Sequence, residues 1–192
     1  SVAYVNAHSA DPHYLVILGS SWVTTAITTG SGSTHRDLTP IIKLYDTDLV
    51  MFVPAGSPMR SIKDIADALV KVAAPMIFGF STSAGNVSHI ALAEIARIAG
   101  ADPRKLRIVV NASGSITATQ VAGGHVSAGI SSSGSAQAMV STGKIRLTGT
   151  ISNQRLPQLP DLPTLREPCA RPSASNENRL SPRKVSMLLL PT

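Results

Sequence analysis

The sequence predicts an α/β fold whose sheets are mainly parallel, and two observations support this. From residue 76 to residue 150, short apolar runs alternate with segments of helical periodicity, and the connecting turns are short. Neighbouring parallel strands need a crossover connection such as a helix, so this alternation is typical of a parallel sheet. Hydrophobic residues make up 43% of the 192 residues and aromatic residues only 4%, which favours close packing of helices on a sheet.

Three strands are predicted before the first clear helix. Residues 14–18 form an apolar run rich in β-formers, and Gly19 with two serines closes it. Residues 41–45 and 49–53 are two further strand candidates, separated only by residues 46–48. The short separation suggests one long bent segment that crosses between two lobes.

The best-specified helix covers residues 61–72. Ser61 and Asp64 have the spacing of a capping box, in which the acid reaches back to free N–H groups of the first turn. Apolar residues then recur on one face, and we expect Ile65 and Leu69 to be buried. A second helix leads to a stop at Gly100.

The remaining elements repeat the same unit. Strands are predicted at residues 76–80, 106–110, 126–130 and 145–150, with helices that end near Val121 and Ser141. Residues 53–145 should therefore form one compact α/β lobe. Prolines punctuate the segment that follows, and residues from Pro168 onward lack periodicity, which predicts an irregular tail.

Charge and cysteine content exclude several classes of function. Half of the formal charge of +6 lies beyond Pro168, and the other basic residues are scattered, so nucleic-acid binding is not expected. Cys169 is the only cysteine, and the histidines lack metal-ligand spacing, so we expect no metal site. The sequence contains no secretory signal pattern and no run long enough to span a bilayer.

Serine-rich turns are the feature most indicative of function. Three predicted strands end in turns of Ser, Gly and Thr that open a helix, at residues 81–85, 113–115 and 131–135, and residues 19–21 are a fourth candidate. In an open α/β sheet such turns meet at the carboxyl edge, where helix N-termini favour an anion. A carboxylate is therefore the expected ligand. The same residue types would also be selected if they served only as helix N-caps.

Two other classes of function are alternatives to a solute-binding protein. His89 lies near a helix start and could act with a nearby serine in a small α/β hydrolase, but neither a G-x-S-x-G elbow nor a suitably placed acid accompanies it. We therefore expect His89 to be a structural or cleft-lining histidine and not a catalytic one. An effector-binding domain of a transcription regulator would normally bring a helix-turn-helix, which the sequence does not show.

Seven short motifs occur in the order and spacing of one known family. They are D-P-H-Y-L at residue 11, D-L-T-P-I at 37, the two-part motif of F-V-P at 52 and S-I-K-D-I at 61, G-N-V-S-H-I at 85, V-A-G-G-H-V at 121, G-K-I-R at 143 and L-P-D-L-P-T at 159. Together they resemble the Bug-type receptors, which are the solute-binding subunits of tripartite tricarboxylate transporters. The resemblance covers residues 11–164.

The resemblance implies a type II periplasmic-binding-protein-like fold with two lobes, a small carboxylate or related solute, and permease subunits in the membrane as partners. It also implies no catalytic residues and no cofactor. It implies a partial first lobe and hinge at residues 1–54, a second lobe at 55–145, a return segment to the first lobe at 146–167 and an irregular tail at 168–192. The expected location is the periplasm. The ligand-binding residues carried over are Ser20, Ser21, Thr24, Ser81, Ser83, Gly85, His89, Ser113, Gly114, Ser115, Ser131, Ser132 and Ser133.

The family's opening strand-helix-strand unit and closing segment have no counterpart in these 192 residues, so the resemblance also implies a truncated first lobe. A receptor gains affinity by closing both lobes on its ligand, and weak or absent solute binding is therefore expected. An apolar sheet edge near residues 14–18 should be left uncovered, which favours association. A complete copy would be a monomer.

Overall fold

A computed structural model describes residues 2–9, 11–19, 22, 24, 30, 37–71, 76–165, 167 and 184–191. The chain divides into two compact units. The smaller contains Ser1–Thr47, Gly85–Val87 and Arg183–Thr192, and the larger contains Asp48–Ala84 and Ser88–Pro182. Each unit has its own sheet, which confirms the predicted α/β class. No helix within the described ranges is long and apolar enough to cross a membrane.

The larger unit is built on a five-stranded sheet with the order β5-β4-β6-β3-β7. The strands are β3 (Leu49–Pro54), β4 (Ile77–Ser81), β5 (Arg107–Asn111), β6 (Ala128–Ser132) and β7 (Ile145–Thr150). β4 is parallel to β5 and β6, and β3 is antiparallel to β6 and β7. Four strands therefore run in one direction and only β3 runs in the other, as expected for a mainly parallel sheet.

Four α-helices connect these strands: α3 (Ile62–Val70), α4 (Val87–Ala99), α5 (Gly114–Ala122) and α6 (Ser133–Ser141), with a short 3-10 helix, η2 (Pro103–Lys105). α3 begins with the predicted capping box. The Ser61 side chain accepts a hydrogen bond from Asp64 N, and the Asp64 carboxylate accepts one from Ser61 N. Ile65 is fully buried as expected, whereas Leu69 is only half-buried.

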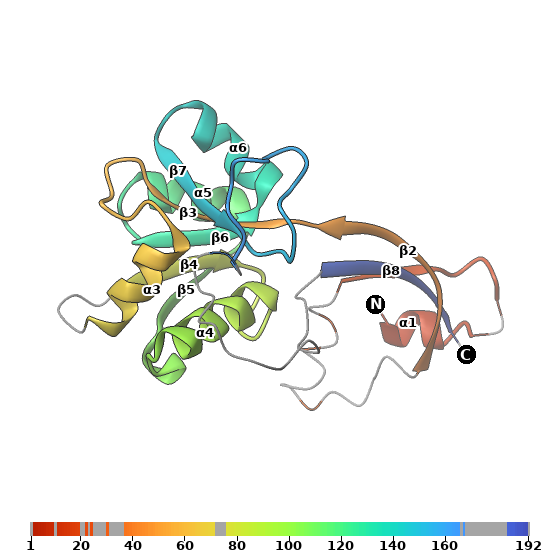
Figure 1. Ribbon diagram of the computed structural model, residues 1–192. Helices are drawn as coiled ribbons and strands as arrows, with labels where there is room; N and C mark the ends of the chain where they lie inside the picture. Colours follow the sequence, from red (N-terminus) through yellow and green to blue (C-terminus); the bar gives the residue numbers. More distant parts are fainter. Residues whose placement is uncertain are drawn as a thin grey trace. The chain divides into compact units, whose positions relative to one another are not determined.

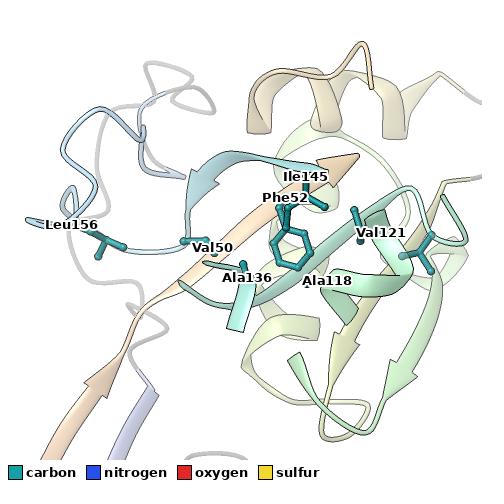
Figure 2. Close-up of a cluster of buried hydrophobic side chains, with 8 residues drawn as sticks. Val50, Phe52, Ala118, Val121, Ala136, Ile145 and Leu156 are labelled. Carbon is teal, nitrogen blue, oxygen red and sulfur yellow. The ribbon is translucent and has the colours of Figure 1, made fainter. Parts of the chain in front are cut away.

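α5 and α6 cover one face of the five-stranded sheet (Figure 1). Phe52 of β3 lies in the core on this face, with Ala118 and Val121 from α5 and Ala136 from α6 (Figure 2). These side chains are fully buried. Burial of apolar surface of this kind is the main stabilising contribution to the unit.

The opposite face of the sheet is covered by α3 and α4. Met51 pairs with Gly149, so both lie on the face opposite Phe52, and a Cβ on Gly149 would come within 2.7 Å of Ile62 Cγ1 of α3. Phe80 of β4 stacks on His89 of α4 with ring centroids 5.5 Å apart. Helices on both faces leave the ends of the strands as the exposed part of this unit.

The smaller unit contains a helix, α1 (Val2–Asn6), and a three-stranded sheet of β1 (Val16–Leu18), β2 (Leu38–Thr47) and β8 (Lys184–Pro191). Its core holds Val2 and Leu38, with Val16, Leu18 and Trp22 packed against them. This sheet is antiparallel throughout, unlike the parallel arrangement expected for both lobes. Tertiary pairing of distant segments produces this difference, because local sequence patterns do not specify strand direction.

The tail is a second difference, since residues 184–191 form β8 where the sequence analysis expected irregular structure. The expectation rested on the lack of local periodicity from Pro168. The run from Val185 to Leu190 is rich in apolar residues, and the strand exists through its pairing with β1 and β2, which are more than 130 residues away in the chain. Such long-range pairing leaves no periodic signal in a local window.

The boundaries of the units also differ from the predicted domains. The larger unit begins at Asp48 and not after Pro54, because β3 pairs with β6 and β7. Residues 146–167 were expected to return to the first lobe, but they belong to the larger unit. Thr150 bridges Thr164, and Leu156 is buried in the core that contains Phe52.

An exposed ion pair between Arg155 and Glu167 links the two ends of residues 155–167. This pair makes the stability of the fold depend on pH. The Arg155 guanidinium donates to the Glu167 carboxylate at 2.6 Å, and this contact lowers the pKa of Glu167 from 4.5 to about 2. Because the pKa is lower in the folded state, the pair stabilises the fold above pH 4.5, and the contribution is lost as the pH falls toward 2. Arg155→Gln should return the Glu167 pKa toward 4.5 in an NMR titration. Arg97→Gln, which removes the pair with Glu94, is the control and should leave the pKa of Glu167 unchanged.

Candidate functional site

The candidate site lies at the carboxyl edge of β4, β5 and β6 in the larger unit. These strands are adjacent and parallel, and Ser81 at the end of β4 pairs with Asn111 at the end of β5. Ser132 ends β6 at the same edge, because Phe80, the residue before Ser81, pairs with Ile130. The sheet therefore brings the three predicted serine turns to one edge, as the sequence analysis expected.

The second turn places the start of α5 at this edge. Ser113 is the N-cap, and its hydroxyl accepts a hydrogen bond from Ile116 N at 3.2 Å. Ser115, in the first turn of α5, is exposed, and its N–H has no acceptor among the residues that the structure describes. First-turn N–H groups of a helix lack intrahelical partners and favour an anion. This end of α5 can therefore donate hydrogen bonds to a bound carboxylate.

The third turn starts α6 with Ser132 as the N-cap. Its hydroxyl lies 2.8 Å from the Ser135 hydroxyl and accepts a hydrogen bond from Ser135 N at 3.4 Å. Ser133 N donates to Asp48 O at 3.3 Å. Ser131 is only 3% exposed, and its hydroxyl donates to Ser132 O. Capping and burial thus occupy several of the hydroxyls that the resemblance assigned to the ligand.

The two helix starts lie against each other. A Cβ built on Gly114, the first residue of α5, would come within 2.9 Å of the Cβ atoms of both Ser131 and Ser135. Real Cβ atoms essentially never approach so closely. Gly114 therefore has a packing role, because only a residue without a side chain lets the α5 start approach β6 and α6 this closely.

A buried polar chain holds the α5 turn in place. Asn111 Nδ2 donates to Thr117 Oγ1 at 3.1 Å, and Thr117 Oγ1 donates to Ser113 O at 3.1 Å. Thr117 is fully buried and Asn111 is 9% exposed. No sequence motif marks either residue, although their six-residue spacing across a strand-to-helix turn is compatible with such a bond. These two side chains position the site without facing solvent.

Thr82, directly after β4, has an unusual backbone conformation. Its φ is +89°, and it is the one residue other than glycine with positive φ among those described. Its N–H donates to Asn111 O at 3.3 Å, which ties the first turn to the second. A β-branched residue with positive φ is strained, and such strain is often found at functional sites. No sequence pattern signalled this position.

Replacing Thr82 with glycine should raise the stability of the protein by about 1 kcal/mol, because glycine adopts positive φ without the Cβ penalty. The gain is smaller than the full strain because glycine also loses more backbone freedom on folding. Urea unfolding checks this, with Thr82→Ala as the matched control that keeps the Cβ. Equal stabilities of the glycine and alanine variants would show that the backbone at this position is not strained.

The residues predicted for the first turn lie at the end of β4 and at the start of α4. Ser81 and Ser83 are half-buried, and Gly85 has φ +83°, which favours glycine. His89 stacks on Phe80 with an interplanar angle of 22°. The histidine ring therefore has a packing contact on the α4 side of the sheet, in keeping with a structural or cleft-lining role.

Besides Gly85, the predicted residues that belong to the smaller unit are Ser20, Ser21 and Thr24. Ser20 and Ser21 lie outside the described residues, and Thr24 has helical backbone conformation. The edge geometry described above is that of β4, β5 and β6 with α5 and α6 in the larger unit.

The chemistry available at this edge is that of neutral donors. The three turns, residues 81–85, 113–115 and 131–135, contain no charged side chain. Within the described part of the chain, no three His, Cys, Asp or Glu residues lie close enough to hold a metal ion. Hydroxyls, backbone N–H groups and the positive ends of two helix dipoles suit an anion held by hydrogen bonds.

Most of the chain matches one known protein family. Residues 5–178 match the model of TctC, the tripartite tricarboxylate transporter family receptor. A comparison with curated protein sequences finds no match.

Several solved structures share the fold at low sequence identity. "R. palustris Rpa4515 with adipate" is similar with a TM-score of 0.77 and 19% identity over 99% of this chain and 61% of that chain. "MatC (Rpa3494) from Rhodopseudomonas palustris with bound malate" has a TM-score of 0.72 and 18% identity over 99% and 63% of the two chains. A TctC solute-binding protein from Polaromonas, solved without ligand, has a TM-score of 0.74 and 20% identity over 99% and 61%. The chain thus spans about three fifths of the length of these structures.

Proposed function

The chain belongs to the TctC family, the receptors of tripartite tricarboxylate transporters, and on this premise we propose that it binds a small carboxylate at the carboxyl edge of β4, β5 and β6. The observation that carries the proposal is the convergence of two helix N-termini at Gly114 and Ser132 beside the end of β4. The N–H groups of these turns and the Ser115 hydroxyl supply donors, and the helix dipoles favour negative charge.

The absence of charged groups in the three turns also supports a ligand bound by neutral donors. Each uncharged hydrogen bond contributes on the order of 1 kcal/mol, so the anion requires several donors at once. We propose that the remaining residues carried over from the family contribute further contacts. These are Ser81, Ser83, Gly85, His89, Ser113 and Ser133 in or next to the turns, and Ser20, Ser21 and Thr24 in the smaller unit.

The family consists of solute-binding receptors and is not a class of enzymes. We propose accordingly that the chain has no catalytic activity, and the alternative of a hydrolase using a serine and His89 gains no support from this family. We further propose that the protein acts in the periplasm and delivers its solute to permease subunits of the transporter, as the family name indicates. Two solved structures of the same fold contain adipate and malate, which is consistent with a carboxylate ligand.

The affinity of the 192 residues by themselves should be lower than that of a receptor of full family length. Receptors of this kind gain affinity by closing two lobes on the ligand, and the chain spans about three fifths of the similar structures. We also propose that it associates through β1, an edge strand on which Ile17 is 62% exposed and which Leu15, 49% exposed, directly precedes. Exposed apolar edges favour intermolecular pairing.

A thermal-shift screen against mono-, di- and tricarboxylates tests the proposed function. A ligand that binds the native state raises the melting temperature by mass action. The best acid is then measured by calorimetry against variants at Ser113, the α5 N-cap. Ser113→Asp keeps a good N-cap but places a like charge beside the carboxylate, and affinity should fall at least about tenfold.

Two variants serve as controls for this test. Ser113→Asn keeps the cap without the charge and should lower affinity by no more than about fivefold, the loss of one neutral hydrogen bond. Ser141→Asp adds the same charge at the opposite end of α6 and should leave affinity nearly unchanged. If Ser113→Asp bound acids as tightly as the parent, the α5 turn would not be the binding site.

A further inference from the structure

β8 takes the central position in the sheet of the smaller unit. The strand order is β1-β8-β2, and β8 is antiparallel to both neighbours. Leu188 pairs with Ile17 on one side and with Ile42 on the other. Among the described residues, β1 and β2 have no other ladder partner, so both strands depend on β8 for their backbone hydrogen bonds.

This strand comes from outside the part of the chain that matches the family. The match ends at residue 178, and β8 begins at Lys184. Sixteen residues, 168–183, separate β8 from Glu167, the last described residue before it. An extended chain spans about 3.3–3.6 Å per residue, so sixteen residues can bridge up to about 50 Å.

We propose that the space between β1 and β2 is a strand-binding site, and that the chain's own segment 184–191 is its ligand. Unpaired backbone N–H and C=O groups on two facing strands are a template for an added strand. The ladder hydrogen bonds provide affinity whether or not the ligand is covalently attached. The site therefore accepts an extended, mainly apolar peptide, and the fold of the smaller unit depends on its occupancy. This inference is independent of carboxylate binding.

Replacing Leu188 with proline in the full chain tests whether β1 and β2 depend on β8. Leu188 pairs with a residue on each of these strands, and proline has no backbone N–H. Hydrogen exchange of Leu188→Pro should show amides in residues 16–18 and 38–47 exchanging at least about tenfold faster, while β3 to β7 keep their protection. Asn178→Pro, in the connection before β8, is the matched control and should leave the amide exchange rates of both sets of strands unchanged. Unchanged protection of β1 and β2 in Leu188→Pro would overturn the proposal.

Cleavage of the folded protein tests whether segment 184–191 stays bound between β1 and β2 without a covalent link. A specific protease site replaces residues 173–178, and the folded full chain is cut and passed over a sizing column under native conditions. The tail should co-elute with the body, and a labelled peptide of residues 183–192 should exchange into the cut protein, whereas the same peptide with L188P should bind at least about tenfold more weakly.

Immediate release of the tail on cutting would contradict the strand-binding site. A dimer that disappears when the tail is removed would contradict the assignment to the chain's own tail, since the strand would then come from a second copy.

Discussion

Phe52→Ala should destabilise the larger unit by about 3–5 kcal/mol, the typical cost of truncating a fully buried phenylalanine. The Phe52 side chain has no exposed surface and lies in the core between β3 and the helices α5 and α6 (Figure 2). Removing the ring takes away its buried apolar area and leaves a cavity that the surrounding structure fills only in part. Chemical denaturation followed by circular dichroism measures the loss.

Val70→Ala is the control for this prediction. Val70 lies on α3 with 47% of its surface exposed, so the substitution should change stability by less than about 0.5 kcal/mol. A loss below about 1 kcal/mol for Phe52→Ala would mean that the core around β3 is loosely packed. In that case the close contacts described for the sheet would not hold the candidate site in place.

Gly129→Ala should destabilise the same unit by about 1–3 kcal/mol through overpacking. A Cβ on Gly129 of β6 would lie 2.7 Å from Phe52 Cζ and 3.0 Å from Val121 Cγ2. Neither partner can move freely, because both side chains are fully buried. Gly134→Ala is the matched control, since nothing lies within 4 Å of that position and the exchange should be nearly neutral or slightly stabilising.

A double-mutant cycle separates this mechanism from a general loss of strand stability. If the new methyl group clashes with the Phe52 ring, it has room once the ring is gone, so Phe52→Ala with Gly129→Ala should cost less than the two single losses added together. Strict additivity of the two losses would show that the cost of Gly129→Ala does not arise from contact with Phe52.

The family and the proposed site follow largely from short-range features of the sequence. The capping box at Ser61 and Asp64, the helix stop at Gly100 and the strands of the larger unit could all be predicted because each depends on neighbours a few residues away. The seven ordered motifs led to the family that residues 5–178 match. The gathering of the serine turns could also be predicted, because parallel strands end at one edge.

The role of each serine hydroxyl in those turns could not be predicted from the sequence. It could not tell that Ser131 is buried or that the Ser132 hydroxyl is engaged with Ser135, because N-capping and ligand binding select the same residue types. The left-handed backbone of Thr82 and the Asn111–Thr117 hydrogen bond were missed as well. Both arise from the way β4, β5 and α5 pack together.

The α/β class, most helix and strand positions in the larger unit, and the family can be read from local patterns in the chain. Three features emerge only when distant segments pair: β3 runs against its neighbours, the larger unit begins at Asp48, and residues 184–191 complete the smaller sheet. The two groups of features differ in the range of the interactions that produce them. Periodicity and capping act within a turn or two of helix, whereas strand direction and strand insertion depend on backbone hydrogen bonds between segments far apart in the chain.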